Sequence, residues 1–555
     1  MCGIFALLNT LNNSIPIGVI QNEFIKGKTR GPEFSKLDTS YLNMILGFHR
    51  LAINGLNEKS NQPLIYNDVI LICNGEIYNY KQLYKYIDYN PVTDSDCEVI
   101  IHLYLKYGIE QTLNMLDGVF AFVLYDKNSN KIFIARDPIG IRPLFYLKNN
   151  LKNNQLNNLY GFTSELKCLE YFYNININNY SIKQFTPGTY STFNFNSNWA
   201  VEKENIPYFI PSFSYSLLIN ENDIFTNISN YLNAAVNKRC LTTERPIACL
   251  LSGGLDSSLI ASLVNNFYNV NNLPNKLETY SIGLKDSEDL KYAKIMANYL
   301  GTNHTEIVVT EKQMFEAIPE VIKAIESYDT TTVRASIGNY LLGKYISMHS
   351  QAKVIFNGDG ADELFGGYLY MNKCPDDIEF DKEIRRLLKD IHLFDVLRSD
   401  KSISSNGLEP RTPFLDRSFV NYILSIQPYF RNHNNNKSIE KYILRTSFSK
   451  SIFTDCNDRQ LIPDEILWRK KEAFSDGVSS HGRSLYHILQ EQIAYKMNID
   501  ENTNDYKPCI ETEKQYYKYI FDKAYPNCLH ILPYFWMPKY TNATDPSART
   551  LTFYS

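Results

Sequence analysis

The pattern of apolar residues changes once along the chain, near Pro207, and this change constrains the fold more than any other feature. Before Pro207, short alternating or apolar runs recur, each bounded by Gly, Pro, Asn or Asp, which is typical of β-strands. Such runs occupy residues 42–46, 69–73, 119–125, 131–135 and 144–147. We expect one helix near residues 97–107 and a loop in the Asn-rich stretch 149–158. This part of the chain therefore predicts a β-rich domain.

After Pro207, short apolar strands alternate with longer helical segments, which predicts a parallel sheet covered by helices on both faces. The expected strands are residues 247–251, 277–282, 304–309 and 353–356. The expected helices are residues 257–266, 288–300, 312–328 and 336–350, and the chain past Gly367 is expected to be mainly helical. We therefore expect two domains, residues 1–206 and residues 207–555.

Composition excludes several classes of protein. The chain has 60 acidic and 56 basic residues, and a net charge of −4 gives no electrostatic basis for binding nucleic acid. No apolar run approaches the ~18 residues of a membrane-spanning helix, and the N-terminus lacks the features of a secretory signal. The ten cysteines form no Cys-x-x-Cys pair, so neither a disulfide scaffold nor a structural zinc site is expected. We expect a cytoplasmic protein with reduced thiols.

Cys2 directly follows the initiator methionine and is small enough for that methionine to be removed. The thiol would then lie on the first residue, beside an α-amino group with a pKa of about 7.7–8.0 that can act as its base. The alternative is a small buried apolar side chain, which is the usual role of a free cysteine.

Four further residues could supply the chemistry that a Cys2 nucleophile needs. Asn74 and Gly75 follow the expected strand 69–73, where we expect a turn, and a side-chain amide beside a backbone N–H can hold an oxyanion. An ordinary Asn-Gly hairpin turn is the alternative. Arg50 could bind a carboxylate through two parallel hydrogen bonds. Asp96 could form an ion pair with an ammonium group or merely cap a helix.

Five ordered motifs resemble the class II glutamine amidotransferases: residues 1–5, 30–32, 74–79, 94–98 and 136–144. The resemblance implies an N-terminal-nucleophile hydrolase with a four-layer αββα sandwich. It also implies that Cys2 is the nucleophile and that Asn74 and Gly75 form the oxyanion hole. The implied glutamine site comprises Arg50 for the α-carboxylate, Asp96 for the α-ammonium, and Leu51, Ile53, Asn74, Gly75 and Glu76. The family often has His before the Arg-Gly-Pro motif, and this chain has Thr29.

In the second half, a Ser/Gly-rich loop at residues 252–258 lies between an expected strand and an expected helix. Backbone N–H groups and a helix N-terminus there suit a phosphate, and Asp256 could hold Mg²⁺ on it. A tight turn is the alternative. A second loop, at residues 357–368, contains Asp359, Asp362 and Glu363, which could bind metal or transfer protons. Its alternative is a solvated loop with a helix cap.

The 252–258 loop resembles the pyrophosphate loop of ATP pyrophosphatases, and the whole chain resembles the glutamine-hydrolysing asparagine synthetases. Further matching stretches are residues 328–336, 411–416 and 468–477. The resemblance implies an α/β parallel-sheet synthetase domain with a helical C-terminal part, and Mg²⁺ on Asp256 and Asp362. The implied ATP site comprises Leu250, Ser252, Gly253, Gly254, Leu255, Asp256, Ser257, Ile282, Asn357, Gly358 and Lys471, and the implied aspartate side comprises Thr331, Thr332 and Arg334.

The resemblance implies a reaction between small molecules: L-glutamine, L-aspartate and ATP. It implies no nucleic acid or membrane partner, and it is compatible with a homodimer. Ammonia is mostly protonated near neutral pH and then cannot attack, so we also expect a shielded apolar path between the two sites. Asp359 stands where the family usually has a catalytic Glu, and a misplacement of ~1 Å can cost ~10²-fold in rate. Two alternatives remain: a related synthetase acting on another carboxylate, and a non-enzymatic descendant.

Overall fold

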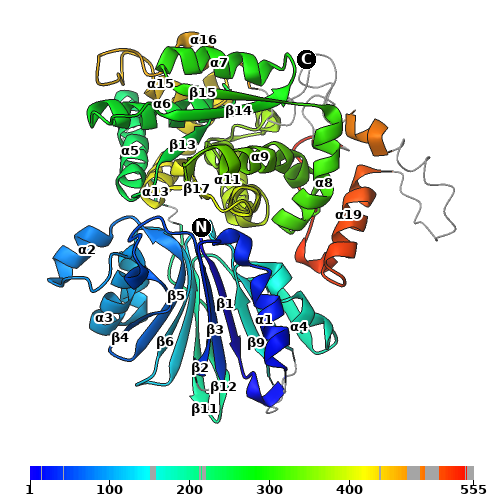
Figure 1. Ribbon diagram of the computed structural model, residues 1–555. Helices are drawn as coiled ribbons and strands as arrows, with labels where there is room; N and C mark the ends of the chain where they lie inside the picture. Colours follow the sequence, from blue (N-terminus) through cyan, green and yellow to red (C-terminus); the bar gives the residue numbers. More distant parts are fainter. Residues whose placement is uncertain are drawn as a thin grey trace.

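The computed structural model describes the chain except for residues 14, 42, 151–157, 212–213, 216–219, 437–438, 472–487, 494–511, 544–545 and 547–555. Most of the expected Asn-rich loop, and most of the motif at 468–477, therefore lie outside the described residues. The chain forms two halves, one stacked on the other, with the N-terminus at the junction between them (Figure 1). No helix in the described part combines the length and the apolar character needed to cross a bilayer.

The N-terminal half contains two antiparallel six-stranded sheets, with strand orders β10-β8-β9-β1-β3-β2 and β12-β11-β7-β6-β5-β4. The first sheet comprises β1 (Gly3–Leu8), β2 (Phe34–Tyr41), β3 (Met44–Arg50), β8 (Phe145–Asn149), β9 (Tyr160–Thr163) and β10 (Tyr180–Gln184). The second comprises β4 (Leu64–Tyr66), β5 (Val69–Ile77), β6 (Gly118–Asp126), β7 (Lys131–Arg136), β11 (Thr189–Asn196) and β12 (Asn198–Pro207). The helices are α1 (Ile17–Ile25), α2 (Tyr80–Ile87), α3 (Val99–Met115) and α4 (Glu170–Asn174).

Side chains alternate along the strands and fill three apolar layers, which makes this half a sandwich. Ile4 and Ala6 of β1 pack with Ile70 and Ile72 of β5 between the two sheets. Phe5 of β1 points the other way, into a cluster with residues of α1 and α4. The opposite face of β5 packs against α2 and α3. The period-2 alternation of a strand with two covered faces explains this arrangement, and the predicted αββα sandwich is confirmed.

The C-terminal half is built on a parallel sheet with the order β15-β14-β13-β16-β17. Its strands are β13 (Ile247–Leu250), β14 (Glu278–Leu284), β15 (Asn303–Val309), β16 (Val354–Phe356) and β17 (Glu409–Arg411). The helices of its first part are α5 (Glu221–Leu241), α6 (Leu255–Val270), α7 (Glu288–Leu300), α8 (Glu311–Ile325) and α9 (Thr330–His349). Later helices are α10 (Ala361–Phe365), α11 (Asp377–Asp390), α12 (Asp395–Ser404), α13 (Arg417–Ser425), α14 (Pro428–Arg431), α15 (Tyr442–Ser447), α16 (Asp464–Leu467) and α19 (Glu513–Ala524).

Both faces of the parallel sheet are covered, as predicted. Ala248 and Leu250 belong to an apolar cluster with residues of α8 and α9, whereas Ile247 and Cys249 cluster with residues of α5 and α6. Strand β17 has no counterpart among the expected strands, because it is three residues long and contains Pro410. Proline is tolerated there because β17 is an edge strand.

Two of the predicted element boundaries that differ from the structure have a clear physical cause. We expected a turn at Asn74 and Gly75, but β5 continues through both to Ile77 and stays paired with β6. Gly75 instead permits close approach to β6, since a Cβ there would lie 2.6 Å from the Val119 oxygen. The helix expected from residue 336 begins at Thr330, because the Asp329 carboxylate caps it.

Two candidate active sites

The first site lies where β1, β3 and β5 come together. The backbone N–H of Cys2 donates to Asn74 Oδ1 at 3.2 Å, and the Cys2 thiol lies 3.7 Å from the carbonyl oxygen of Leu51. Asn74 is fully buried, and its Nδ2 donates to Ser164 Oγ at 3.4 Å. The fold therefore brings a thiol and a side-chain amide together from positions 72 residues apart.

Arg50 and Asp96 are held rigidly beside this pair. Arg50 Nη1 donates to Asn61 Oδ1 at 2.7 Å and to the Asn57 carbonyl at 2.9 Å. Asp96 Oδ2 accepts from the backbone N–H of Ile77 at 2.7 Å. Both side chains are nearly buried, so the site offers one fixed cation and one fixed carboxylate to a ligand.

Glu76 connects this site to the other half of the molecule. Its Oε2 accepts from Asn54 Nδ2 at 2.7 Å and lies 3.2 Å from Arg411 Nη2 on β17. Leu51 and Ile53 are buried in the same apolar cluster as α5 and α6. The predicted glutamine-site residues thus lie at the junction of the two halves.

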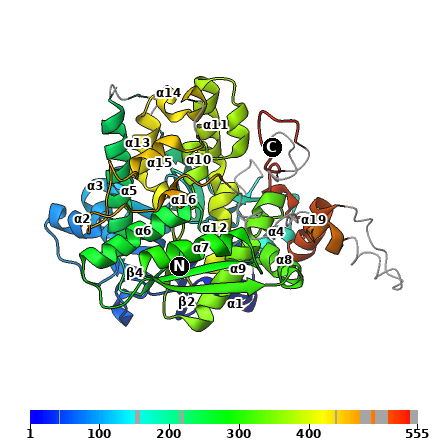
Figure 2. The ribbon, with the colours of Figure 1, turned by 90° about the horizontal axis from the view of Figure 1, so that it is seen from above.

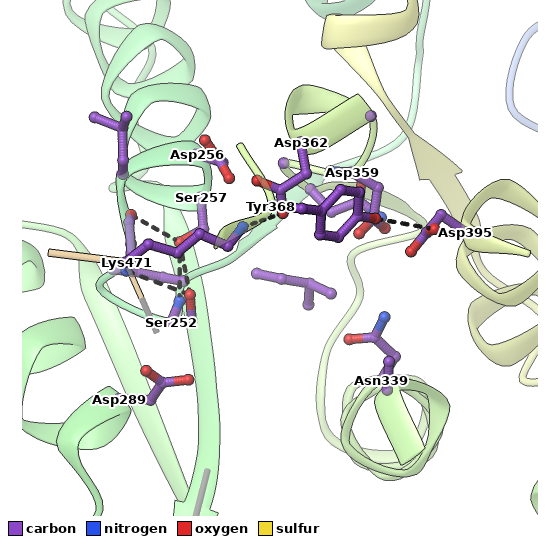
Figure 3. Close-up of a pocket in the computed structure, with 18 of the residues that line it drawn as sticks. Ser252, Asp256, Ser257, Asp289, Asn339, Asp359, Asp362, Tyr368, Asp395 and Lys471 are labelled. Atoms are coloured by element: carbon purple, nitrogen blue, oxygen red, sulfur yellow. Dashed lines mark hydrogen bonds and ion pairs between the residues drawn. The ribbon is translucent and has the colours of Figure 1, made fainter. Parts of the chain in front are cut away.

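The second site is a cavity of about 260 Å³ at the carboxyl ends of the parallel strands, where ligands bind in sheets of this type. Figure 3 shows its Ser252–Ser257 side opposite Asp359 and Asp395. It is lined by most of the residues predicted for this half: Leu250, Ser252, Gly254, Leu255, Asp256, Ser257, Ile282, Thr331, Arg334, Asn357, Gly358, Asp359, Asp362 and Lys471.

Two of the predicted residues, Gly253 and Thr332, do not line the cavity. Gly253 has φ +74°, and a Cβ there would lie 2.4 Å from the backbone of Tyr292 and Ala293. Its role is therefore to let the loop pack tightly on α7. The Thr332 hydroxyl donates to Asp329 at 2.8 Å, so this side chain serves the cap of α9.

The 252–257 loop has the features of an anion-binding site. Ser252 Oγ and Ser257 Oγ lie 3.0 Å apart, and the N–H of Ser252 donates to Ser257 Oγ at 3.2 Å. The 16-residue helix α6 begins at Leu255, so its partial positive charge faces the same place. Hydroxyl groups and a helix N-terminus together favour bound phosphate.

Acidic and basic side chains meet beside this loop. Lys441 Nζ lies 2.5 Å from Asp256 Oδ2 and 2.6 Å from Asp362 Oδ1, and Lys471 forms an ion pair with Asp362. The two ammonium groups hold the pKa of Asp362 well below its usual range. Asp256 Oδ1 has no hydrogen-bond partner among the described residues. Two neighbouring carboxylates, of which that of Asp256 has an oxygen without a hydrogen-bond partner, fit Mg²⁺. This ion is typically bound by one or two carboxylates plus substrate phosphates.

Asp359 lies on the opposite side of the cavity, next to α12. Arg398 Nη2 is 3.1 Å from Asp359 Oδ1 and 2.7 Å from Asp395 Oδ1. Asp359 Oδ2 has no hydrogen-bond partner within the described part of the chain. One carboxylate oxygen is thus anchored, and the other is available to a ligand.

Comparison with known proteins decides the family. A model described as glutamine amidotransferase domain matches residues 1–202, and a model described as asparagine synthase matches residues 227–376 and 372–530. The chain belongs to the asparagine synthase family. It is 38% identical to the glutamine-hydrolysing asparagine synthetases of Pongo abelii and Homo sapiens over 581 residues, and 39% identical to that of Gallus gallus over 582. Each alignment covers 100% of this chain and 99% of the relative.

This member of the asparagine synthase family has cavity residues that the sequence reasoning did not single out. Lys441 belongs to none of the quoted motifs, and only the fold brings it between Asp256 and Asp362. Arg398 reaches the cavity from α12, and the Tyr368 hydroxyl donates to Glu363 Oε1 at 2.6 Å. Arg334 was predicted for the aspartate side, and its Nε donates to Glu513 Oε1 at 2.8 Å.

Burial raises the pKa of Asp96 to about 6. Protonated Asp96 cannot form an ion pair with an α-ammonium group, so the predicted role of Asp96 in glutamine binding requires the ionised form. We expect KM for glutamine to rise as pH drops below about 6, approaching tenfold per pH unit. A pH profile of glutamate release tests this. An Asp96→Asn variant should have a high KM that no longer rises below pH 6, whereas a KM that still rises there in that variant would contradict the assignment.

Proposed function

We propose that this chain makes L-asparagine from L-aspartate, with L-glutamine as the nitrogen donor and ATP cleaved to AMP and pyrophosphate. The observation that carries the proposal is the pairing of two sites in one chain. A pair formed by the half-buried Cys2 and the buried Asn74 lies in the first half, and a phosphate-binding loop with paired carboxylates lies in the second. Full-length similarity to glutamine-hydrolysing asparagine synthetases supports the same reaction.

In the first site, Cys2 Sγ attacks the side-chain carbonyl carbon of glutamine, and the thiol proton moves to the α-amino group exposed by removal of Met1. Burial raises the pKa of the Cys2 thiol, so the thiol is neutral and needs this base. Asn74 Nδ2 and the Gly75 N–H donate to the oxyanion. The C–N bond breaks, ammonia leaves with a proton, and water hydrolyses the thioester to glutamate.

In the second site, a β-carboxylate oxygen of aspartate attacks the α-phosphorus of ATP, and pyrophosphate leaves. The 252–257 loop and Lys471 hold the phosphates, while Leu250 and Ile282 contact the adenosine. Mg²⁺, bound by Asp256 and Asp362, would withdraw charge from the phosphates. Ammonia then attacks the acyl carbon of the aspartyl adenylate, and AMP leaves with one former carboxylate oxygen. The unbonded oxygen of Asp359 then accepts a proton from the attacking ammonia, a role that its lack of a hydrogen-bond partner within the described residues supports.

An apolar cluster between the halves supports the expected ammonia path. Tyr78, Val119 and Ile141 of the first half pack with Val396 and Leu415 of the second, and all are at most 5% exposed. Leu415 also packs against Gly360, which follows Asp359, since a Cβ at Gly360 would lie 2.5 Å from the Leu415 side chain. The cluster thus extends from β5 and β6 toward the second cavity.

Several assignments stay predictions. These are the division at residues 206 and 207, the individual roles of the site residues, Mg²⁺ as the metal, the cytoplasmic location and a homodimer.

The Asp359 carboxylate should control the synthetase step. We expect Asp359→Asn to lower kcat for asparagine formation by about 10²-fold with either nitrogen source, because it removes a proton acceptor. Asp359→Glu keeps the charge and serves as the matched control, with a smaller loss. Asparagine formation with ammonium measures both variants, and a normal rate in Asp359→Asn would refute the role.

The function is tested by incubating the protein with Mg-ATP and aspartate plus either glutamine or ammonium, and measuring asparagine, AMP and pyrophosphate. We expect the three products in equal amounts with both nitrogen sources. Glutamate without asparagine or pyrophosphate would refute the aspartate assignment and favour another carboxylate. Pyrophosphate without asparagine would show that adenylation occurs and that transfer fails.

A further inference from the structure

A fully buried arginine holds the backbone of the nucleophile. Arg30 lies in a short 3₁₀ helix of the first half, is 0% exposed, and its Nε donates to the carbonyl oxygen of Cys2 at 2.9 Å. Because the bond reaches the backbone of Cys2 itself, a shift of the guanidinium shifts the nucleophile.

The groups that fix Arg30 come largely from the other half of the chain. Its Nη1 lies 2.7 Å from Asp400 Oδ1 and 2.9 Å from Ser404 Oγ, both on α12, and 2.9 Å from Glu165 Oε1. Arg142 provides the second cation on Asp400, at 3.3 Å from Oδ2. All of these side chains are buried, so water screens none of the ion pairs.

The next residue of α12 makes a second connection. Lys401 Nζ lies 3.2 Å from Glu165 Oε2 and 3.4 Å from the carbonyl oxygen of Ser164. The hydroxyl of Ser164 accepts from Asn74 Nδ2 and from the N–H of Ile4. One helix of the second half therefore supports both the nucleophile and the predicted oxyanion donor.

The same helix also forms part of the second cavity. Arg398, which pairs with Asp359, lies two residues before Asp400. Residues two apart point to nearly opposite sides of a helix, so Arg398 faces the cavity while Asp400 faces Arg30. Seen from above, α12 lies near the middle of the molecule (Figure 2). A phosphate or carboxylate bound in the cavity would compete with Asp359 and Asp395 for Arg398, and would thereby act on α12.

We propose that Asp400, a residue of the synthetase half, is a positioning residue for glutamine hydrolysis. Acting through Arg30, it fixes Cys2, and because α12 also carries Arg398, the rate of glutamine hydrolysis responds to ligands in the synthetase cavity. An anion that fixes Arg398 fixes the helix, and a nucleophile held in one position attacks faster. This inference rests on the proposed function for the identity of the cavity ligands, Mg-ATP and aspartate.

The test uses the full-length protein and measures kcat and KM for glutamate release, with and without Mg-ATP and aspartate. In the parent protein, we expect these ligands to raise kcat by about 5-fold or more. Asp400→Asn should lower kcat by about 10-fold to 10²-fold with KM nearly unchanged, because Asp400 does not touch glutamine, and the response to ligands should vanish. Loss of structure alone would lower the amount of active enzyme without removing that response.

Two further variants keep the test decisive. Ser404→Ala removes one acceptor of Arg30 and no charge, so it should fold even where Asp400→Asn does not, with a smaller loss of kcat and a weaker response. Lys238→Met breaks another ion pair between the halves, with Asp117, that includes neither Arg30 nor Cys2 nor a residue of α12, and the variant should keep the parent response.

A parent protein with no response to the ligands, or a folded variant with parent kcat and response, would overturn the inference. Asparagine formation with ammonium is measured on the same samples. If the parent protein makes no asparagine from either nitrogen source, the proposed function fails. If the parent protein makes asparagine and the folded variants hydrolyse glutamine with the parent kcat and response, only this inference fails.

Discussion

Replacement of Cys2 by alanine is expected to lower glutamine-dependent asparagine formation by at least about 10³-fold, equivalent to ~4 kcal/mol of activation free energy. Without the thiol no thioester forms, and Asn74 and Arg50 can only bind glutamine. Ammonium-dependent synthesis should continue at the parent rate, because the second cavity contains none of these groups. Asparagine formation with each nitrogen source, measured on one preparation, gives the glutamine-dependent and the ammonium-dependent rates.

Cys168→Ala is the matched control for Cys2→Ala. Cys168 is a buried cysteine of the same half, next to Gly27, and it has no part in the proposed chemistry. We expect it to keep both activities. Substantial glutamine-dependent synthesis in Cys2→Ala would contradict the nucleophile assignment, and equal loss with both nitrogen sources would indicate general damage to the fold.

Replacement of Lys471 by methionine is expected to impair the synthetase site and leave glutamine hydrolysis intact. Its ammonium group pairs with Asp362 at the phosphate side of the cavity, and removal of one charge-stabilising donor typically costs about 10²- to 10³-fold in kcat. Asparagine formation should therefore fall with both nitrogen sources, while glutamine is still hydrolysed. Pyrophosphate and glutamate release, measured side by side, separate the two effects.

Lys471→Arg conserves the charge and should recover part of the lost rate, although a planar guanidinium does not reproduce the geometry of an ammonium group. A Lys471→Met variant that forms pyrophosphate normally would refute the phosphate-binding role. A variant that loses glutamine hydrolysis as strongly as asparagine formation would show that the substitution disturbs more than the cavity.

The sequence was most informative where a pattern has a local physical cause. Strand-to-helix alternation after Pro207 follows from a sheet covered on both faces, and the structure has that architecture. The predicted helix 288–300 matches α7 at both ends, because Ser287 precedes an acidic first turn and Gly301 ends the helix in the left-handed region. The Ser/Gly-rich loop that begins at Ser252 also lies between a strand and a helix, β13 and α6, as expected.

The sequence was least informative where tertiary contacts decide. Asn74-Gly75 has the composition of a turn, yet close pairing with β6 makes it part of a strand. Lys441 comes within 2.6 Å of Asp362, a residue 79 positions earlier, and no local pattern indicates this contact. Asp400 reaches Arg30 across 370 positions for the same reason. Such pairs depend on how the two halves pack, which short-range spacing does not encode.

The central claim is that one chain moves nitrogen from glutamine to aspartate through its interior. The most direct test supplies glutamine labelled with ¹⁵N in its side-chain amide, together with aspartate, Mg-ATP and an excess of unlabelled ammonium, and measures ¹⁵N in the asparagine amide. We predict that label greatly exceeds its share of the bulk ammonia, because ammonia released at Cys2 reaches the second cavity before it mixes with solvent. Asparagine labelled only in proportion to the bulk pool would contradict the account.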